Sequence, residues 1–186
     1  MNKKIIIVLV FILILAGGGF FWWWQDRESV RELNRDLPEG VRVIKNLAGE
    51  YWVINEIDGY EIKVPEEWGG LERINYFSDQ TENKEYNITG INILGLKGES
   101  RLISIDQYKI KEGMVDLENF AKELLKKSEI LTNLIQDRVG NKEVFRLNEP
   151  LPLIGQMYFI ENENSIFLIG GISDKFIRGI IANGKW

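Results

Sequence analysis

The sequence contains no cysteine and no histidine, and these two absences exclude many common catalytic and metal-binding arrangements. Without cysteine there is no disulfide, no thiolate nucleophile and no cysteine-based zinc site. Without histidine there is no Ser-His-Asp triad, no imidazole general base and no histidine-ligated metal. We therefore expect no cofactor, no metal site and a protein that is not an enzyme.

The charge balance is also one-sided. The chain has 23 basic and 28 acidic residues, a formal net charge of −5. Lys3 and Lys4 account for two of the basic residues and precede a long apolar run, so the part that follows the run carries −7. Such a surface repels nucleic acid and anionic lipid headgroups. Nucleic acid is therefore not an expected partner.

The apolar run itself, residues 5–24, contains no charged or polar side chain. About 20 residues at 1.5 Å each give a helix of roughly 30 Å, which matches the hydrocarbon core of a bilayer. We predict a transmembrane helix here, so the lipid bilayer is an expected partner of this segment.

Aromatic residues close the run, at Phe21, Trp22, Trp23 and Trp24. Tryptophan favours the headgroup level because its ring has an apolar body and one N–H group. We therefore predict a membrane-interface belt formed by these four residues. The alternative is a cleaved signal peptide, but a secretory apolar region is usually shorter, at about 7–15 residues.

The remaining organisation follows from this anchor. A very short basic tail before an early span favours a cytoplasmic amino terminus and an exported carboxyl-terminal part. We predict a helix from Gln25 to Leu37, because Pro38 disfavours helical conformation at the residue before it. The predicted divisions are a cytoplasmic tail at residues 1–4, a transmembrane helix at 5–24, a juxtamembrane helix or linker at 25–40 and an extracytoplasmic domain at 41–186.

Strand signals dominate the exported part. The stretch "YWVINEIDGYEIKVP" has two β-rich runs around Asp58-Gly59, a dipeptide that favours a hairpin turn. Similar runs predict further strands at Arg73–Phe77, Asn87–Leu94, Leu102–Lys109, Leu134–Val139, Lys142–Leu147, Gln156–Ile160 and Ser165–Ile169.

Two helices are predicted among these strands. Residues 116–128, "DLENFAKELLKKS", place apolar side chains at helical spacing along one face, and Asp116 can cap the first turn. A second, shorter helix is predicted at residues 174–182. Strands joined by tight turns favour antiparallel pairing, with helices covering the sheet. The expected fold is therefore α+β, with a central antiparallel sheet behind the membrane anchor.

Three motifs resemble the PsbP-like fold family, across about Tyr51 to Ala182. They are "YEIKVPEEW", "GNKEVFRL" and "QMYFIENENSIFLIGGISDKFIRGII". The resemblance implies an α/β/α sandwich and a role in assembly or binding. Photosynthetic members of this family are described as using histidine and acidic residues around ions. This chain has no histidine, so no site residue carries over.

Three short motifs are candidate sites. Glu66-Glu67-Trp68 could pair two carboxylates beside an aromatic platform, as in a sugar site, although a solvated turn with Trp68 packed against the sheet is the simpler interpretation. The turn Glu161–Asn164 offers oxygen ligands of the kind that Ca²⁺ accepts, but it lacks the spacing of an EF-hand. Asn87-Ile88-Thr89 matches a glycosylation triplet inside a predicted strand.

Three functions remain open. The first is a non-catalytic binding or scaffolding module, anchored in the cell membrane by one pass, whose partner is another membrane or cell-envelope protein. The second is a carboxylate-dependent enzyme acting on cell-wall sugars, using acids such as Glu66, Glu67 or Asp106. The third is a small-ligand sensor or carrier with a cavity between helix 116–128 and the sheet.

Overall fold

The computed structural model describes residues 29–79, 86–97, 102–111, 116–163 and 165–186. The predicted transmembrane segment 5–24, with its belt at Phe21, Trp22, Trp23 and Trp24, lies outside the described residues. Within the described ranges, no helix is both long enough and apolar enough to span a bilayer. The described part of the chain is an α+β domain built on two antiparallel sheets.

The smaller sheet has three strands in the order β1-β2-β3, namely β1 (Val41–Lys45), β2 (Tyr51–Asn55) and β3 (Tyr60–Lys63). The hairpin predicted around Asp58-Gly59 is confirmed as the β2–β3 connection, and Gly59 takes the positive φ of +79° that such a turn favours. Strand β1 was not predicted. Its alternating burial pattern extends over only five residues, directly after Pro38 and Gly40.

The larger sheet has seven strands in the order β4-β5-β6-β10-β9-β8-β7, and all neighbours are antiparallel. Every strand predicted after the first hairpin is present. The strands are β4 (Leu71–Asp79), β5 (Tyr86–Gly95), β6 (Leu102–Ile110), β7 (Leu134–Val139), β8 (Lys142–Leu147), β9 (Gln156–Asn162) and β10 (Ser165–Gly171).

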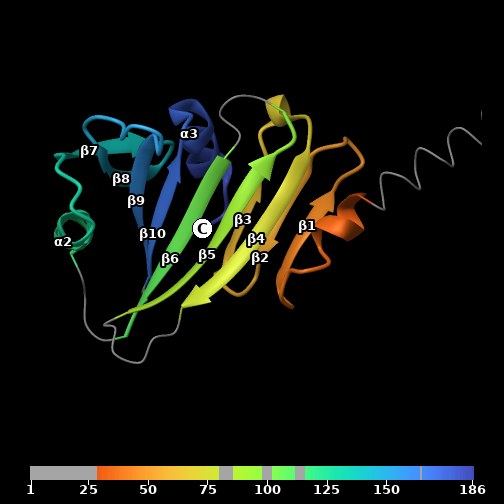
Figure 1. Cartoon of the computed structure of the whole chain (residues 1–186), viewed down its shortest axis with the longest axis horizontal. Helices are drawn as coiled ribbons and strands as arrows, with labels where there is room; N and C mark the ends of the chain where they lie inside the picture. Colours follow the sequence, from red (N-terminus) through yellow and green to blue (C-terminus); the bar gives the residue numbers. More distant parts are fainter. Residues whose placement is uncertain (1–28, 80–85, 98–101, 112–115, 164) are drawn as a thin grey trace, which may run out of the picture.

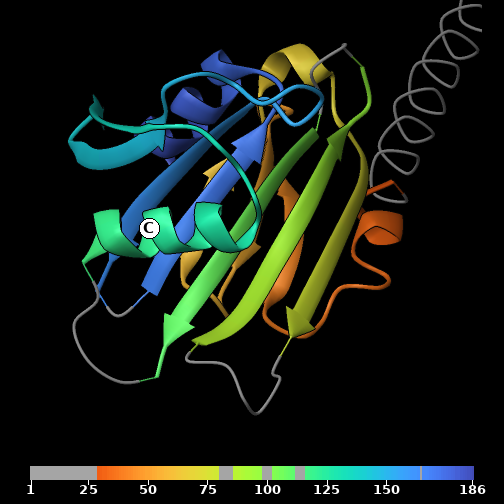
Figure 2. The same cartoon turned by 60° about the vertical axis from the view of Figure 1, so that its left-hand side comes forward.

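Helices lie on both faces of the larger sheet (Figure 1). Strands β1–β3 and helix α3 (Asp174–Asn183) cover one face and share a buried hydrophobic core with it. Helix α2 (Leu117–Lys127) crosses the other face, as Figure 2 shows. Asp116 caps α2 as predicted, because its carboxylate accepts a hydrogen bond of 2.8 Å from the Asn119 N–H.

The helix that precedes β1 ends earlier than predicted. Its described helical residues are 29–33, and a turn follows at 34–36, whereas the sequence predicted helix to Leu37. The side chain of Asn34 gives the reason. Its Oδ1 accepts from the Val43 N–H at 2.7 Å, and its Nδ2 donates to the Val43 carbonyl at 2.9 Å. The Asn34 amide therefore pairs with the free edge of β1 and turns the chain toward the sheet.

Helix α3 is fastened to the far end of the larger sheet by a charged cluster. Asp137 on β7 accepts from Arg178 of α3 at 2.7 Å and from Arg146 of β8 at 2.8 Å. The hydrogen bond from Arg178, followed by that from Arg146, lowers the pKa of Asp137 to about 2. Asp137 therefore stays ionised at neutral pH and joins three elements.

Candidate binding surfaces

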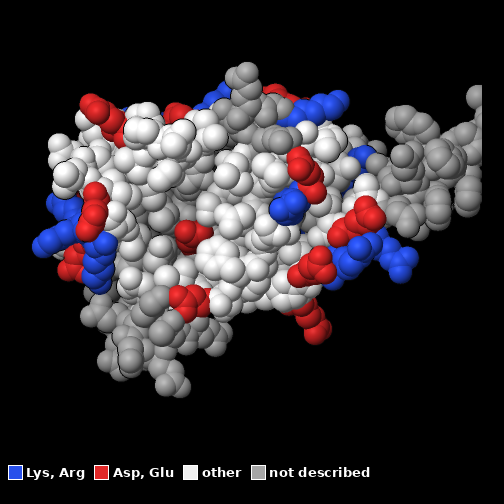
Figure 3. Space-filling view, viewed as in Figure 1, with Lys and Arg blue, Asp and Glu red and all other residues white. Residues whose placement is uncertain are grey.

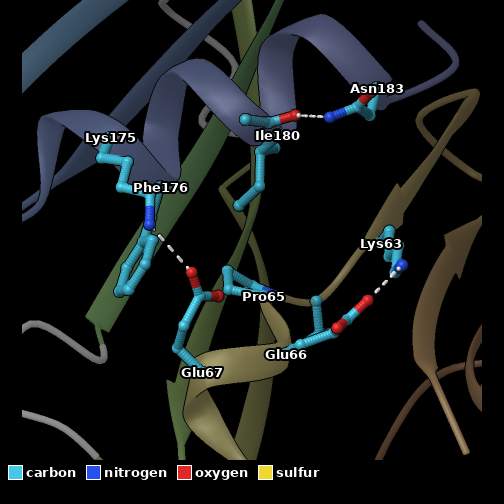
Figure 4. A pocket seen from close by; sticks show the side chains of 10 residues that line it. Lys63, Pro65, Glu66, Glu67, Lys175, Phe176, Ile180 and Asn183 are labelled. Atoms are coloured by element: carbon cyan, nitrogen blue, oxygen red, sulfur yellow. Dashed lines mark hydrogen bonds and ion pairs between the residues drawn. The ribbon is translucent and has the colours of Figure 1, made fainter.

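A cleft of about 460 Å³ separates α3 from the segment that follows β3 (Figure 4). Its floor is apolar, and charged or amide side chains stand at its rim. Five of its lining residues come from Lys63–Glu67 and five from α3: Lys175, Phe176, Gly179, Ile180 and Asn183. Its volume lies within the range of about 300–1,000 Å³ that is usual for small-ligand sites. We call this region the α3 cleft.

Local backbone chemistry builds the near wall of the α3 cleft. Pro65 follows the end of β3, and the short 3-10 helix η1 (Glu66–Trp68) begins directly after it. Gly69 ends η1 in the left-handed conformation, with φ of +64°. Trp68 is only 1% exposed and lies against Gly95 of β5, where an added Cβ would come within 2.5 Å of the indole. This close contact fixes η1 to the sheet.

Each carboxylate at the rim of the α3 cleft is matched by a lysine. Oε1 of Glu66 lies 2.8 Å from Nζ of Lys63, and Oε1 of Glu67 lies 3.0 Å from Nζ of Lys175 in α3. A hydrogen bond from its own backbone N–H, and then the contact with Lys175, lowers the pKa of Glu67. A general acid at neutral pH needs a raised pKa. Glu67 is therefore ionised at neutral pH and is not suited to act as a general acid.

The predicted sugar site at Glu66-Glu67-Trp68 is not formed as a carboxylate pair beside an exposed ring. Trp68 is buried and cannot serve as an aromatic platform. The simpler interpretation, a turn with Trp68 packed against the sheet, is the one that the structure has. Asp106 lies on the opposite face of the larger sheet from the core that contains Trp68, because its neighbour Ile105 faces that core. The structure therefore does not gather the three candidate acids.

A second surface is the face of β4, β5 and β6 that is turned away from β1–β3. We call it the open face. Phe77 of β4 and Leu102 of β6, at its two sides, are 37% and 45% exposed. Figure 2 shows α2 in front of the neighbouring strands, while no element drawn in colour lies in front of β4 and β5 in this view. Figure 3 shows a broad white area on this side of the molecule, interrupted by isolated red acidic side chains.

Cross-strand register places Asp106 in the middle of the open face. Phe77, Gly90 and Asp106 are direct partners across β4, β5 and β6, and Leu168 of β10 continues the row. A Cβ built on Gly90 would lie 2.4 Å from the ring of Phe77 and 2.9 Å from Oδ1 of Asp106. The aromatic ring and the carboxylate therefore share the space above this glycine. Asp106 is the single charged residue that the described parts of β5 and β6 present on this face, and β4 adds Arg73 and Asp79 nearer its two ends.

The carboxylate of Asp106 has a neutral partner. Ser104 Oγ donates to its Oδ1 at 2.8 Å, and among the described residues no lysine or arginine pairs with it. Burial raises the pKa of Asp106, and the Ser104 hydrogen bond partly opposes this rise. Aspartate is disfavoured in strands. Its position here is a local departure from strand preference of the kind that often marks function.

The cavity predicted between helix 116–128 and the sheet is present only at one end of the helix, because side chains fill the middle of the contact. Phe120 and Leu125 of α2 pack into a buried cluster with Phe159 and Leu168 of the sheet. At the start of α2, a groove of about 830 Å³ is left between the helix and strands β7, β8 and β9, and Glu161 is among its lining residues. Within the part of the chain that the structure describes, no group of three or more acidic side chains could hold a metal ion.

The last two motifs occupy ordinary structural positions. Glu161 and Asn162 end β9. Glu163 follows in the turn with φ of +50°, and Asn164 lies outside the described residues. The Asn87-Ile88-Thr89 triplet is in β5, as predicted, and Thr89 is buried.

A buried polar cluster that the sequence did not reveal joins the two sheets. The carboxylate of Asp58, in the β2–β3 turn, accepts from Thr89 Oγ1 at 2.6 Å and from Asn55 Nδ2 at 2.7 Å. Gln107 Nε2 donates to the Asp58 carbonyl at 3.1 Å, and Lys109 Nζ lies 3.5 Å from its carboxylate. The cluster holds the turn of the smaller sheet against β5 and β6. It fixes the position of the hairpin that leads into η1 and the α3 cleft.

Comparison with known proteins identifies no relative. No family model, no curated protein and no solved structure matches this chain.

Proposed function

We propose that this protein is a membrane-anchored extracytoplasmic binding module, held at the outer membrane surface by residues 5–24 and their aromatic belt. The amino terminus is cytoplasmic, and the domain at 41–186 is exported. The uncharged length of the apolar run supports the anchor. An anchor restricts the domain to the membrane surface, which raises its effective concentration near other membrane proteins.

The finer architecture in this proposal is a transmembrane helix followed by an α/β/α sandwich of the PsbP-like kind. The three motifs that carry the resemblance fall on separate parts of the domain. They coincide with β3 and η1, with β8, and with the β9–β10 hairpin and α3. A sandwich of this kind is expected to act through its surfaces, as an assembly or binding module.

The observation that carries the proposal is Asp106 in the middle of the open face. The carboxylate is surrounded by uncharged residues and shares the space above Gly90 with the ring of Phe77. A cation is attracted both by a carboxylate and by the face of an aromatic ring. The chemistry of this point therefore matches a lysine or arginine side chain of a partner protein, inserted where the direct cross-strand neighbours of Asp106 are uncharged.

A second copy of this chain fits the open face less well. A two-fold contact uses the same patch on both copies. With Asp106 in the middle of the patch, such a contact brings two carboxylates together, and like charges in a contact are unfavourable. The occupant that we propose is therefore a different membrane or cell-envelope protein with a basic side chain in its contact surface.

Site-specific photo-crosslinking in membranes tests this proposal. The full chain carries the photoreactive amino acid benzoylphenylalanine at Leu102, which lies on the open face and is partly exposed. We expect one discrete cross-linked protein, with a lysine or arginine close to the cross-linked position. Asp106→Lys should reduce the yield at least tenfold, because it places like charges in contact. Asp106→Asn, which keeps the size of the side chain, should reduce the yield less.

The matched control places the same photoreactive amino acid at Leu131, which is fully exposed after α2, and it should not give the same product. Thermal unfolding of both Asp106 variants checks that they are folded. Equal yields from the native chain and a folded Asp106→Lys variant would refute the role of Asp106. A product made only of two copies of this chain would refute the partner that we propose.

A further inference from the structure

The α3 cleft offers a second site, separate from the open face. A lysine–glutamate ion pair stands at each of its two ends. Glu67 and Lys175 meet across the cleft, whereas Lys63, the last residue of β3, and Glu66 of η1 lie close together in the chain. Val64 and Ile180 are buried beneath them, and Phe176 lines the same floor. An apolar floor between mixed charges is complementary to a small molecule that carries both charges and an apolar group.

Gly179 is the residue that points to an occupant. It lies inside α3 and lines the cleft, and a Cβ built on it would meet nothing within 4 Å. A glycine in the interior of a helix is destabilising relative to alanine. Packing within the described domain does not require it. The missing side chain keeps the middle of the cleft open, at a cost to the stability of the helix.

The charged rim is able to reorganise around a ligand. The side chains of Glu66 and Lys175 are 72% and 79% exposed, and ion pairs that are this exposed contribute little to stability. A ligand carboxylate can therefore take the place of Glu67 at Lys175, while a ligand ammonium group takes the place of a lysine at Glu66 or Glu67. Little stability is lost by opening the existing pairs.

From this geometry we infer that the α3 cleft binds a zwitterionic amino acid or short peptide with an apolar side chain, which lies over Gly179. The ligand carboxylate pairs with Lys175 and its ammonium group with Glu66 or Glu67. The apolar side chain lies on Phe176. This site is independent of the partner surface around Asp106, so either proposal can fail without the other.

Titration of the isotope-labelled full chain in detergent tests the inference, with amide chemical shifts as the readout. The probe is leucyl-leucine with free termini, and the control ligand is the same dipeptide with acetylated and amidated ends. We expect the free dipeptide to shift the amide signals of Phe176 and Gly179. The blocked dipeptide, which has lost both charges, should bind at least tenfold more weakly.

Substitutions at Gly179 separate binding from folding. Gly179→Ala should raise Tm by about 1–4 °C, because alanine favours the helix and meets no obstacle. Gly179→Leu should fill the cleft and weaken the free dipeptide at least tenfold. Lys175→Gln should also weaken it. Glu123→Leu, which places a leucine on the exposed side of α2 away from the cleft, should leave binding unchanged.

Three results would overturn the inference. The first is equal affinity for the free and the blocked dipeptide. The second is the absence of any amide shift at about 10-millimolar free dipeptide, where a dissociation constant of that size corresponds to a binding free energy near −3 kcal/mol. The third is undiminished affinity in a folded Gly179→Leu variant.

Discussion

Replacement of Thr89 by valine removes one hydroxyl group from the buried cluster that joins the two sheets, with little change in the shape of the side chain. The Thr89 hydroxyl donates to the carboxylate of Asp58 at 2.6 Å, and both residues are buried. The carboxylate keeps the Asn55 amide and the more distant ammonium group of Lys109. Thr89→Val therefore tests one link between the β2–β3 turn and β5.

The size of the effect follows from the charge of the acceptor. A hydrogen bond to a charged group contributes about 1.5–3 kcal/mol, and loss of the donor leaves a buried acceptor with one partner fewer. A loss of about 2 kcal/mol should lower Tm by roughly 4–8 °C in a domain of this size. Thr89→Ser, the matched control, keeps the hydroxyl and removes one methyl group. It should cost about 0.8 kcal/mol.

Thermal and urea unfolding of the full chain in detergent, followed by circular dichroism, measures both variants. We expect the valine variant to lose about twice as much free energy of unfolding as the serine variant, or more. If the free energy of unfolding of Thr89→Val equals that of the serine variant, or lies within about 0.5 kcal/mol of the native chain, this hydrogen bond does not hold the two sheets together.

Three further substitutions test other parts of the fold. Asp137→Asn should cost about 1–2 kcal/mol at neutral pH, after allowance for partial exposure of the carboxylate. The folded pKa of Asp137, about 2, lies below its ordinary value of 3.8. The loss in free energy of unfolding should therefore persist above pH 4 and disappear as the pH falls toward 2. A loss that is independent of pH would contradict the role of the ionised Asp137 carboxylate. Gly95→Ala should lower Tm strongly, because its methyl group would overlap the buried indole of Trp68, and an unchanged Tm would show that η1 can shift. Asn34→Ala should speed hydrogen exchange at the Val43 amide, which loses its acceptor, and an unchanged exchange rate would argue against the clamp on β1.

The sequence predicted most elements of the fold because periodicity is a local signal. The stripe of apolar residues in 116–128 and the alternation around Asp58-Gly59 both gave elements that the structure contains. The two differences come from contacts between distant residues. Strand β1 is placed by its pairing with β2, and the helix before it ends where Asn34 meets Val43.

The candidate surfaces were less predictable than the fold. The α3 cleft joins residues 63–67 to a helix that begins at Asp174, and no local pattern relates segments so far apart in the chain. Asp106 was identified from the sequence only as an acid. Its position on the open face depends on the register of β6 with β5 and β10. The one local signal that could have been followed is Gly179, a glycine within a predicted helix.

The proposed partner is a membrane or cell-envelope protein, so the partner proposal depends on the membrane anchor at residues 5–24. Alkaline extraction of membranes, followed by intact-mass measurement of the recovered chain, tests it most directly. The account predicts a product that stays in the membrane pellet and still contains residues 5–24, including Trp22, Trp23 and Trp24. A product released into solution that begins at Phe20 or later would contradict it.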